Sequence, residues 1–372
     1  MSRVAQSADP RFAAHERYTR GAMGGQRAKL TYEFINQLVL TRRHLDEIEF
    51  IGCDLPRAQF LYSSLRAASF YCSNIRGADL RGTDLRRADM RGAILRGADL
   101  YRAVLDGADF RSACLARADR DPKLAKPGLD FDDENDLRGG AVDFRNCSMV
   151  GVRLGRAKLK GADFSGAILD KADLAGADIR EAKLDGAVLT NVDLEGVSLD
   201  GVSMAGVVRD PDEAAIRRAT ALIDRIRKSD DYTHSMGKSG KEGKFDQEDL
   251  RPLGAALRDK GLAGASFRQA CAVGVDFSGA ILIGAVFDGA DLRRANFEGA
   301  DLRGCSFKNC NLNHSNFSNA ELSSLDGRSG RRFPPAFAGA QLDAARFDDV
   351  VIDEDKTLNE LLVGVRDDLG AA

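Results

Sequence analysis

The sequence predicts an all-β solenoid with four sides, and two regularities of its apolar residues carry that prediction. In three blocks of the 372-residue chain an apolar residue recurs at every fifth position, and a small residue stands two positions before most of them. Bulky residues also recur at every twentieth position, as in the column Phe50, Phe70, Met90 and Phe110. A period of five fits neither a helix nor a strand. We therefore expect a coil that turns a corner after each five-residue segment, with four segments in each turn.

The repeats divide the chain into seven segments. These are a lead-in (1–29), a first repeat block (30–118), an acidic loop (119–140), a second block (141–207), a helical insert with a flexible linker (208–256), a third block (257–322), and a short repeat coda with a C-terminal helix (323–372). The third block sorts its aromatic residues by side, because the Phe residues of one column alternate with those of another. The two columns are Phe267, Phe287 and Phe307, and Phe277, Phe297 and Phe317.

The repeat units resemble those of the pentapeptide repeat family, whose pattern is Ala-(Asp/Asn)-Leu-x-x. Ala78-Asp79-Leu80-Arg81-Gly82 and Ala290-Asp291-Leu292-Arg293-Arg294 match that pattern directly. The resemblance extends over most of the three blocks and is specific for fold. It implies a right-handed quadrilateral β-helix with Leu, Phe and Ala pointing inward. It implies no single activity, because function resides in sites placed on a fold.

The interruptions predict helices and one loop. The loop 119–140 contains Asp130, Asp132 and Glu134, but Asn135 and Ala141 break the template of a calcium loop, so we expect a solvated acidic loop. Asp210 and Pro211 can start a helix over 211–226. Its stripe of apolar residues is expected to cover an outward column on the second block. The stripe is Ile216, Ala219, Ile223 and Ile226, and the column is Ile168, Val188 and Val208.

The C-terminus predicts a capping helix. Thr357 and Glu360 have the spacing of a capping box, and an apolar side follows them. That side consists of Leu358, Leu361, Leu362, Val365 and Leu369. The helix either seals the last coil or docks a second subunit, and the second alternative would give a homodimer through the C-terminal coils or helix.

The residues needed for catalysis are missing, and we predict that the protein is not an enzyme and has no cofactor or metal. The four histidines are scattered without ligand spacing. Cys53, Cys147, Cys305 and Cys310 occupy the inward small-residue position, where a thiol acts as a small apolar group. Cys114 and Cys271 point outward, with nothing to support a reactive role.

Composition limits the partners and the compartment. The formal net charge of -3 disfavours a strongly basic nucleic-acid binder. No stretch of 18 uncharged apolar residues is present to span a membrane, and the first ten residues have no apolar signal core, so we expect a cytoplasmic protein.

Outward side chains of the first block give the candidate binding surface for a protein partner of unknown identity. Arg residues recur there beside Asp residues, and a few outward positions are apolar or aromatic. The candidates are Leu61, Tyr62, Tyr71, Arg81, Tyr101, Arg91 and Arg111. Tyr and Arg are enriched at the centres of interfaces. The competing interpretation is a solvated lattice of ion pairs, each contributing less than about 1 kcal/mol. The interleaved Asp residues cancel the field of the Arg residues, which disfavours direct nucleic-acid binding.

We therefore predict a non-catalytic protein-protein interaction scaffold. The alternative comes from a subset of the resembling family and is a DNA-mimicking modulator of a type II topoisomerase (gyrase). Duplex DNA carries one charge per about 1.7 Å, so each coil, rising about 4.8 Å, would need roughly three net negative charges. The first block is close to neutral. Only two short stretches are locally acidic, namely Asp185, Asp193, Glu195 and Asp200, and Asp348, Asp349, Asp353, Glu354 and Asp355.

Overall fold

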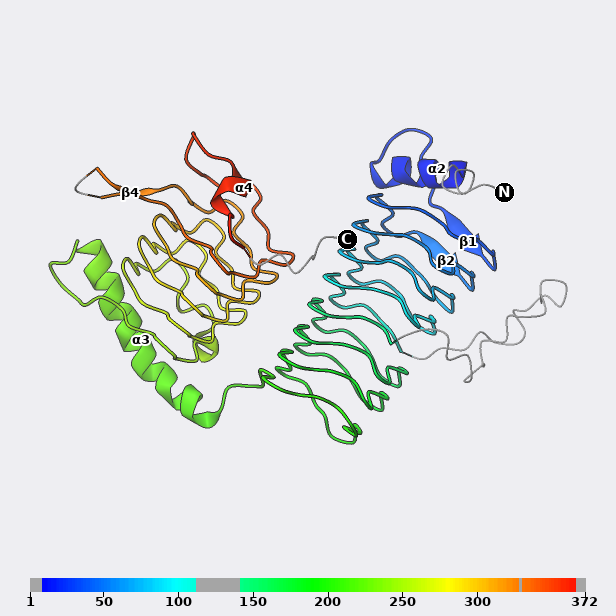
Figure 1. The fold of residues 1–372 in the computed structure, drawn as a ribbon, viewed down its shortest axis with the longest axis horizontal. Helices are drawn as coiled ribbons and strands as arrows, with labels where there is room; N and C mark the ends of the chain where they lie inside the picture. Colours follow the sequence, from blue (N-terminus) through cyan, green and yellow to red (C-terminus); the bar gives the residue numbers. More distant parts are fainter. Residues whose placement is uncertain (1–8, 112–140, 328–329, 366–372) are drawn as a thin grey trace. The chain divides into compact units, whose positions relative to one another are not determined.

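The computed structural model describes residues 9–111, 141–327 and 330–365. The chain divides into two compact units, Met1–Asp210 and Pro211–Ala372, and each contains one coil of repeats (Figure 1). The expected acidic loop and Cys114 lie outside the described residues.

The first coil repeats every 20 residues. β1 (Lys29–Thr31) pairs in parallel with β2 (Glu49–Ile51), with Leu30 opposite Phe50. Beyond these strands the pairing consists of single parallel bridges between residues 20 apart, such as those of Asp54 with Asn74. Four five-residue segments therefore complete one turn of the coil, and the columns of bulky residues in the sequence follow from that register.

The second repeat block stacks directly on the first. Asp99 bridges Asp143 and Asp109 bridges Arg153, so residues 44 apart occupy the positions that are elsewhere 20 apart. One continuous coil in the first unit thus contains both blocks, although the segment between them interrupts the period of five.

The core of each coil is a stack of inward side chains. Phe50 and Phe70 are stacked with ring centroids 5.3 Å apart, and Phe60 meets Phe70 edge-on at 5.6 Å from the other side of the core. In the second coil Phe287 lies between Phe267 and Phe307, at 4.7 and 5.0 Å. Inward residues 20 apart therefore stack, whereas inward residues 10 apart face each other across the core.

The sequence analysis placed the start of the second coil at Leu257, but the coil begins earlier. Lys244 bridges Ser266, and the Phe245 ring stacks on Phe267 at 4.9 Å. The 3-10 turn η2 (Arg251–Leu253) contains a proline and lengthens this first turn of the coil, which hides the period of five in the sequence.

The coda continues the second coil. Ser306 bridges Ala336 and Glu321 bridges Val351, residues 30 apart. The extra length includes an antiparallel hairpin of β3 (Leu325–Asp326) and β4 (Arg332–Phe333), which projects between two turns. Residues 336–351 then complete one more turn.

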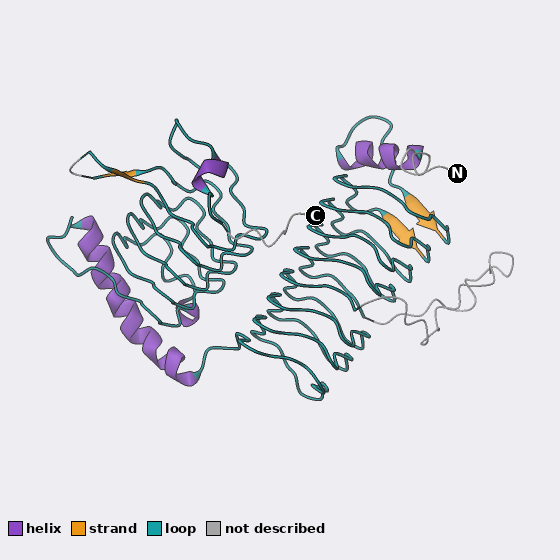
Figure 2. Cartoon of the chain, viewed as in Figure 1, coloured by secondary structure: helices purple, strands orange, loops and turns teal. Residues whose placement is uncertain are grey.

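The lead-in contains a helix that the sequence analysis did not predict, and this helix covers the N-terminal end of the first coil. α2 (Pro10–Thr19) precedes the first turn of this coil (Figure 2). Asp9 caps the helix, and its side chain accepts a hydrogen bond from the Arg11 N–H. Phe12 is buried, with its ring centroid 6.4 Å from that of Phe50. The Asp9-Pro10 pair is the helix start signal in the sequence.

α3 (Glu213–His234) is longer than the expected helix, and Asp212 rather than Asp210 caps it. Leu222 and Ile226 are buried in the core of the second coil. The expectation for the stripe was therefore wrong, because Ile216 and Ile223 are 57% and 52% exposed. Apolar residues spaced three or four positions apart occur on both the buried face of α3 (Leu222 and Ile226) and its exposed face (Ile216 and Ile223). The spacing alone therefore did not show which face packs against a coil.

α4 (Leu358–Leu361) is a single turn with the expected capping box between Thr357 and Glu360. Leu361 is buried in the core of the second coil, and Leu358, Leu362 and Val365 pack against it. Leu369 lies outside the described residues.

Candidate partner-binding faces

Asp and Arg side chains two positions apart form a repeated ion pair on the outside of the coils. Arg81 donates from Nε to Oδ1 and from Nη2 to Oδ2 of Asp79, at 2.9 and 2.8 Å. The same two-pronged contact occurs within the pairs Asp84–Arg86, Asp89–Arg91, Asp109–Arg111, Asp143–Arg145, Asp178–Arg180, Asp249–Arg251, Asp291–Arg293 and Asp301–Arg303. The Asp oxygen also accepts the backbone N–H of its Arg partner, as in Asp79 with Arg81.

This geometry follows from the repeat itself. The residue before each inward Leu and the residue after it both point outward on the same short segment, so their side chains meet. The hydrogen bonds that Arg81 donates to Asp79 raise the pKa of Arg81, and those that Arg145 donates to Asp143 raise the pKa of Arg145. Most outward cations of the first coil are therefore neutralised locally and held in fixed positions.

The seven candidate residues do not form one patch, because the register places them on two opposite sides of the coil. Phe60 and Phe70 face each other across the core. Leu61 follows Phe60 and Tyr71 follows Phe70, so these two outward side chains point away from each other. We call the first side the Tyr62 face (Leu61, Tyr62, Arg81, Tyr101 and the additional residue Arg145). The second side is the Tyr71 face (Tyr71, Arg91 and Arg111).

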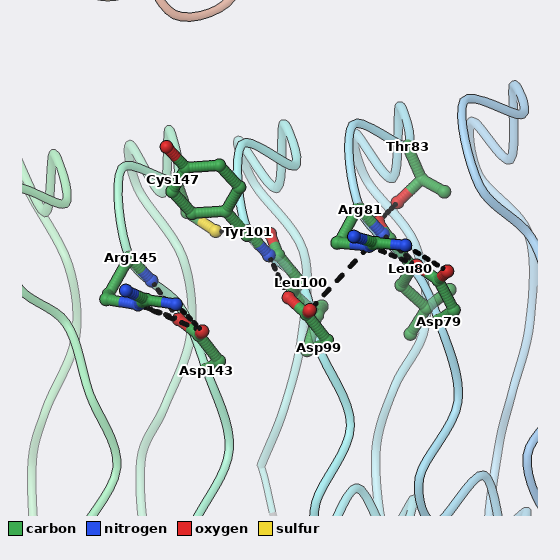
Figure 3. Close-up of polar contacts among 10 residues, drawn as sticks. All are labelled: Asp79, Leu80, Arg81, Thr83, Asp99, Leu100, Tyr101, Asp143, Arg145 and Cys147. Atoms are coloured by element: carbon green, nitrogen blue, oxygen red, sulfur yellow. Dashed lines mark hydrogen bonds and ion pairs between the residues drawn. The ribbon is translucent and has the colours of Figure 1, made fainter. Parts of the chain in front are cut away.

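On the Tyr62 face, Arg81, Tyr101 and Arg145 follow one another in successive turns of the coil (Figure 3). The guanidinium carbons of Arg145 and Arg102 lie 5.4 and 5.0 Å from the centre of the Tyr101 ring, within range of cation-π attraction. Tyr101 is only 9% exposed. The sequence predicted the position of Tyr101, but its contacts with Arg145 depend on the stacking of residues 44 apart, which the sequence could not indicate.

Tyr62 is the large exposed side chain of the same face, with 47% of its surface accessible. Its backbone is left-handed, with φ of 56°. The ring lies over Gly82 of the next turn, where an added Cβ would be 2.5 Å from it, and the guanidinium of Arg42 lies 5.9 Å from its centre on the preceding turn. Gly82 therefore provides the space that holds the Tyr62 ring against the coil.

The Tyr71 face is more strongly cationic in composition and less aromatic. The Arg91 guanidinium lies 5.2 Å from the centre of the Tyr71 ring, and Arg91 also pairs with Asp89 at 2.7 Å. Asp109 contacts both Arg111 and Arg153, at 2.7 and 3.4 Å. Every candidate cation on this face has a carboxylate partner.

A column of four carboxylates runs beside the Tyr62 face. Successive parallel bridges join Asp79, Asp99, Asp143 and Asp163. Burial raises the pKa of Asp99, and the neighbouring Asp143 raises it further, although the Tyr101 backbone N–H and Arg81 act in the opposite direction. Asp99 and Arg81 are 3.7 Å apart. Two of the four carboxylates carry their own Arg partner, which limits the negative field of the column.

The thiols that the structure describes do not have the environment of nucleophiles. Cys53, Cys147, Cys305 and Cys310 are buried in the inward small-residue positions, as the sequence predicted. Burial raises the pKa of Cys53 to about 11 and that of Cys310 to about 12, and it also raises the pKa of Cys271. Within residues 9–111, 141–327 and 330–365, no group of three or more His, Cys, Asp or Glu is placed to hold a metal ion.

The sequence profile of pentapeptide repeats matches the chain with eight copies, over residues 44–82, 83–119, 141–176, 172–208, 262–299 and 290–324, which is more than half of its length. The chain belongs to the pentapeptide repeat family. The resemblance drawn from Ala78–Gly82 and its equivalents is thereby confirmed, and the two coils are the β-helical coils of this family.

Several solved pentapeptide repeat structures are similar to this chain. A protein of the thylakoid lumen of Arabidopsis thaliana is 21% identical, with 35% of this chain and 70% of that chain covered and a TM-score of 0.22. QnrB1, a plasmid-mediated fluoroquinolone resistance protein, is 18% identical in a trypsin-treated form, with 53% and 97% covered and a TM-score of 0.25. HetL, involved in heterocyst differentiation regulation in the cyanobacterium Nostoc sp. strain PCC 7120, is 20% identical, with 90% and 91% covered and a TM-score of 0.16.

No curated protein matches the sequence significantly. Among the helices that the structure describes, none combines the length and apolar character needed to cross a membrane.

Proposed function

We propose that this pentapeptide repeat protein is a non-catalytic scaffold that binds another protein through the Tyr62 face of its first coil. The observation that carries the proposal is the exposed Tyr62 ring on a rigid, locally neutral surface. Tyr62 and the partly buried Leu61 supply apolar contact area, and the paired Asp79 and Arg81 lie one turn away without needing to rearrange. A surface that is already ordered loses little conformational entropy on binding.

Tyr62 is a better contact candidate than Tyr101. Tyr101 is nearly buried between two guanidinium groups, so it supports the face from within, whereas Tyr62 offers almost half of its surface to a partner. The Tyr71 face is the weaker candidate, because its Tyr ring is partly covered by Arg91.

We also propose that the coils are right-handed and quadrilateral and that α4 is a C-terminal cap. The register of 20 residues supports four sides. The packing of Leu358, Leu361, Leu362 and Val365 on their own coil supports capping over the alternative of docking a second subunit through this helix.

DNA mimicry towards a type II topoisomerase is less well supported. The longest carboxylate column has Asp79 and Asp143 paired with Arg81 and Arg145. A mimic of duplex DNA needs an excess of about one negative charge per 1.7 Å. Supercoiling by gyrase and its poisoning by quinolones, measured with and without the purified protein, test this alternative. We expect both to be unchanged.

The scaffold proposal is tested by crosslinked affinity capture from a native lysate. Wild-type protein is compared with Tyr62→Ala and with the control Tyr71→Ala, which removes the same atoms from the opposite face. We expect one reproducible set of partners to be lost with Tyr62→Ala and retained with Tyr71→Ala, at equal melting temperatures. Equal capture by all three proteins, or no partner for the wild type, would contradict the proposal.

A further inference from the structure

One side of the second coil carries a row of charged side chains without ion pairs. Each of these residues follows an inward Phe, and the Phe rings of successive turns stack at distances between 4.7 and 5.0 Å. The parallel register of the turns therefore places the charged residues in one outward column, about 4.8 Å apart. We name it the charged column, and it consists of Asp246, Arg268, Asp288 and Lys308. Among the described residues, none of the four has an ion-pair partner, whereas Arg303 on the neighbouring side pairs with Asp301 at 2.7 Å.

The missing ion pairs follow from the repeat sequence. Where the chain has a repeated Asp–Arg pair, an outward Asp stands two positions before the Arg, as Asp301 does before Arg303. Two positions before Arg268 and Lys308 there is a serine instead. A hydroxyl group can accept a hydrogen bond from a cation but cannot neutralise its charge. The two cations of the charged column are therefore left without a carboxylate on their own segment.

The carboxylates of the column are held in place but keep one oxygen unused. Oδ1 of Asp246 accepts hydrogen bonds from the Ser266 hydroxyl and from the Arg268 N–H. Oδ1 of Asp288 accepts the two equivalent bonds from the following turn. Neither Oδ2 atom has a hydrogen-bond partner within the part of the chain that the structure describes. The column thus presents two fixed carboxylates and two cations that are available to a partner.

The signs of the column alternate, and this order is complementary to its own reverse. From turn to turn the charges are negative, positive, negative and positive. A second column that runs in the opposite direction places Lys308 in front of Asp246 and Asp288 in front of Arg268, so every residue meets an opposite charge. A second column in the same direction would place like charges opposite each other. A surface that matches its own reverse is what a twofold symmetric interface requires.

The surroundings of the charged column allow close approach. The neighbouring outward column contains one charge, Lys244, and otherwise small or apolar residues, namely Ser266, Val286, Ser306 and Ala336. The corner on the other side is hollowed by about 500 Å³ beside Gly289, with Asp246, Arg268 and Asp288 on the wall of the hollow. The aliphatic part of an Arg side chain from a partner fits there, with its guanidinium beside Asp288.

The charge pattern favours a second copy over the chain's own first unit as the partner. The repeated Arg residues of the first unit are already bonded to an Asp two positions earlier, as Arg81 is to Asp79 and Arg145 to Asp143. Within residues 9–111 and 141–210, no outward column alternates in sign over four successive turns. The reversed charged column of another copy provides all four opposite charges in register.

We infer that the charged column binds the same column of a second copy of this chain and forms a closed dimer with twofold symmetry. Arg268 of each copy pairs with Asp288 of the other, and Asp246 of each copy pairs with Lys308 of the other. Alternating charges across the contact fix its register and its antiparallel direction. The inference is independent of the Tyr62 face and involves a different surface from α4.

The test measures the dimer dissociation constant of the full-length chain by sedimentation velocity. Arg268→Glu and Asp288→Arg each place two pairs of like charges across the twofold contact, and each should raise the dissociation constant by at least about tenfold. Arg258→Glu is the matched control, because it makes the same charge change on the opposite side of the coil, where Arg258 is exposed. Its dimer should be unchanged. A wild type that is monomeric at about 100 µM, or a dimer that persists in Arg268→Glu, would overturn the inference.

Mixing the two variants identifies the contact. In a dimer of one Arg268→Glu chain and one Asp288→Arg chain, the exchanged charges are again opposite, so the mixture should form a heterodimer although each variant alone dissociates. Folded variants, checked by thermal unfolding, that do not associate on mixing would overturn the inference.

Salt provides a test that needs no variant, which matters because the Asp288 carboxylate also accepts hydrogen bonds within the coil. Between about 0.1 M and about 1 M salt the Debye length falls from about 10 Å to about 3 Å. The wild-type dissociation constant should rise by at least about tenfold over this range. A dimer that is indifferent to salt would contradict a contact made by the charged column.

Discussion

The docking of α2 on the first coil should depend on pH through His15. The His15 ring is fully buried, and its Nδ1 atom accepts a hydrogen bond from the Ala28 N–H at 3.1 Å. An atom that accepts this bond cannot carry a proton, so the docked helix requires the neutral ring. Its Nε2 atom is buried without a hydrogen-bond partner among the described residues.

Burial lowers the pKa of His15, and the nearby Arg27 lowers it further, whereas the carbonyls of Leu45 and Asp46 and the Asp46 carboxylate oppose them. The undocked ring keeps the ordinary value of about 6.5. Because the pKa is lower in the folded state, the contribution to stability is complete above about pH 6.5 and is lost as the pH falls below it. The loss reaches up to about 1.4 kcal/mol per pH unit, or roughly a tenfold rise in the undocked population.

Hydrogen exchange of the α2 amides, corrected for the intrinsic effect of pH, measures this population. Between pH 6.5 and 5.5 protection should fall by up to about tenfold, while amides of the second unit stay unchanged. His15→Gln is the control, because its amide oxygen can accept the Ala28 bond but does not titrate. Titration of the helix cap Asp9 does not contribute to this pH dependence, because Arg11 holds the pKa of the Asp9 carboxyl below its usual range. The same pH dependence in His15→Gln would refute the reasoning.

Three further predictions concern the coils. Phe287→Ala removes a ring stacked between Phe267 and Phe307 and should cost about 3–5 kcal/mol, measured by denaturant unfolding; a cost below about 1 kcal/mol would show that the stack contributes little. Gly82→Ala should displace the Tyr62 ring and destabilise the first coil by about 1 kcal/mol, because φ is +61° and the new Cβ meets the ring; unchanged stability and Tyr62 fluorescence would contradict this. Arg81→Met should change the free energy of unfolding by less than about 1 kcal/mol, because the pair with Asp79 is solvent-exposed. A larger loss would mean that the outward Asp–Arg pairs stabilise the coil.

Much of the fold could be predicted from the sequence because inward and outward positions alternate with a fixed period. The columns of Phe residues gave the register of 20 residues, and the stacked rings of Phe277 and Phe297 follow from it. The period fails where the chain leaves the coil or re-enters it. The turn at Pro252 breaks the period of five in the first turn of the second coil, so the sequence did not reveal that turn. Tyr101 and Arg145 are 44 residues apart instead of 20, so the sequence did not reveal their contact.

The candidate site was predicted less well, since the sequence orders residues along a column but does not show which columns share a side. Leu61, Arg81 and Tyr101 were correctly placed in one column. Tyr71 belongs to the opposite side, because ten residues correspond to half a turn. The exposure of Tyr62 and the burial of Tyr101 depend on Gly82 and on Arg102 and Arg145, which only the packed coil brings together.

Binding through the Tyr62 face is tested most directly by placing a photo-crosslinking amino acid at that position in the living cell. The same amino acid at position 71 reports on the opposite face. The account predicts a discrete covalent adduct with a partner protein from position 62 and none from position 71. Equal labelling from both positions, or adducts from position 71 alone, would contradict the assignment of the binding face.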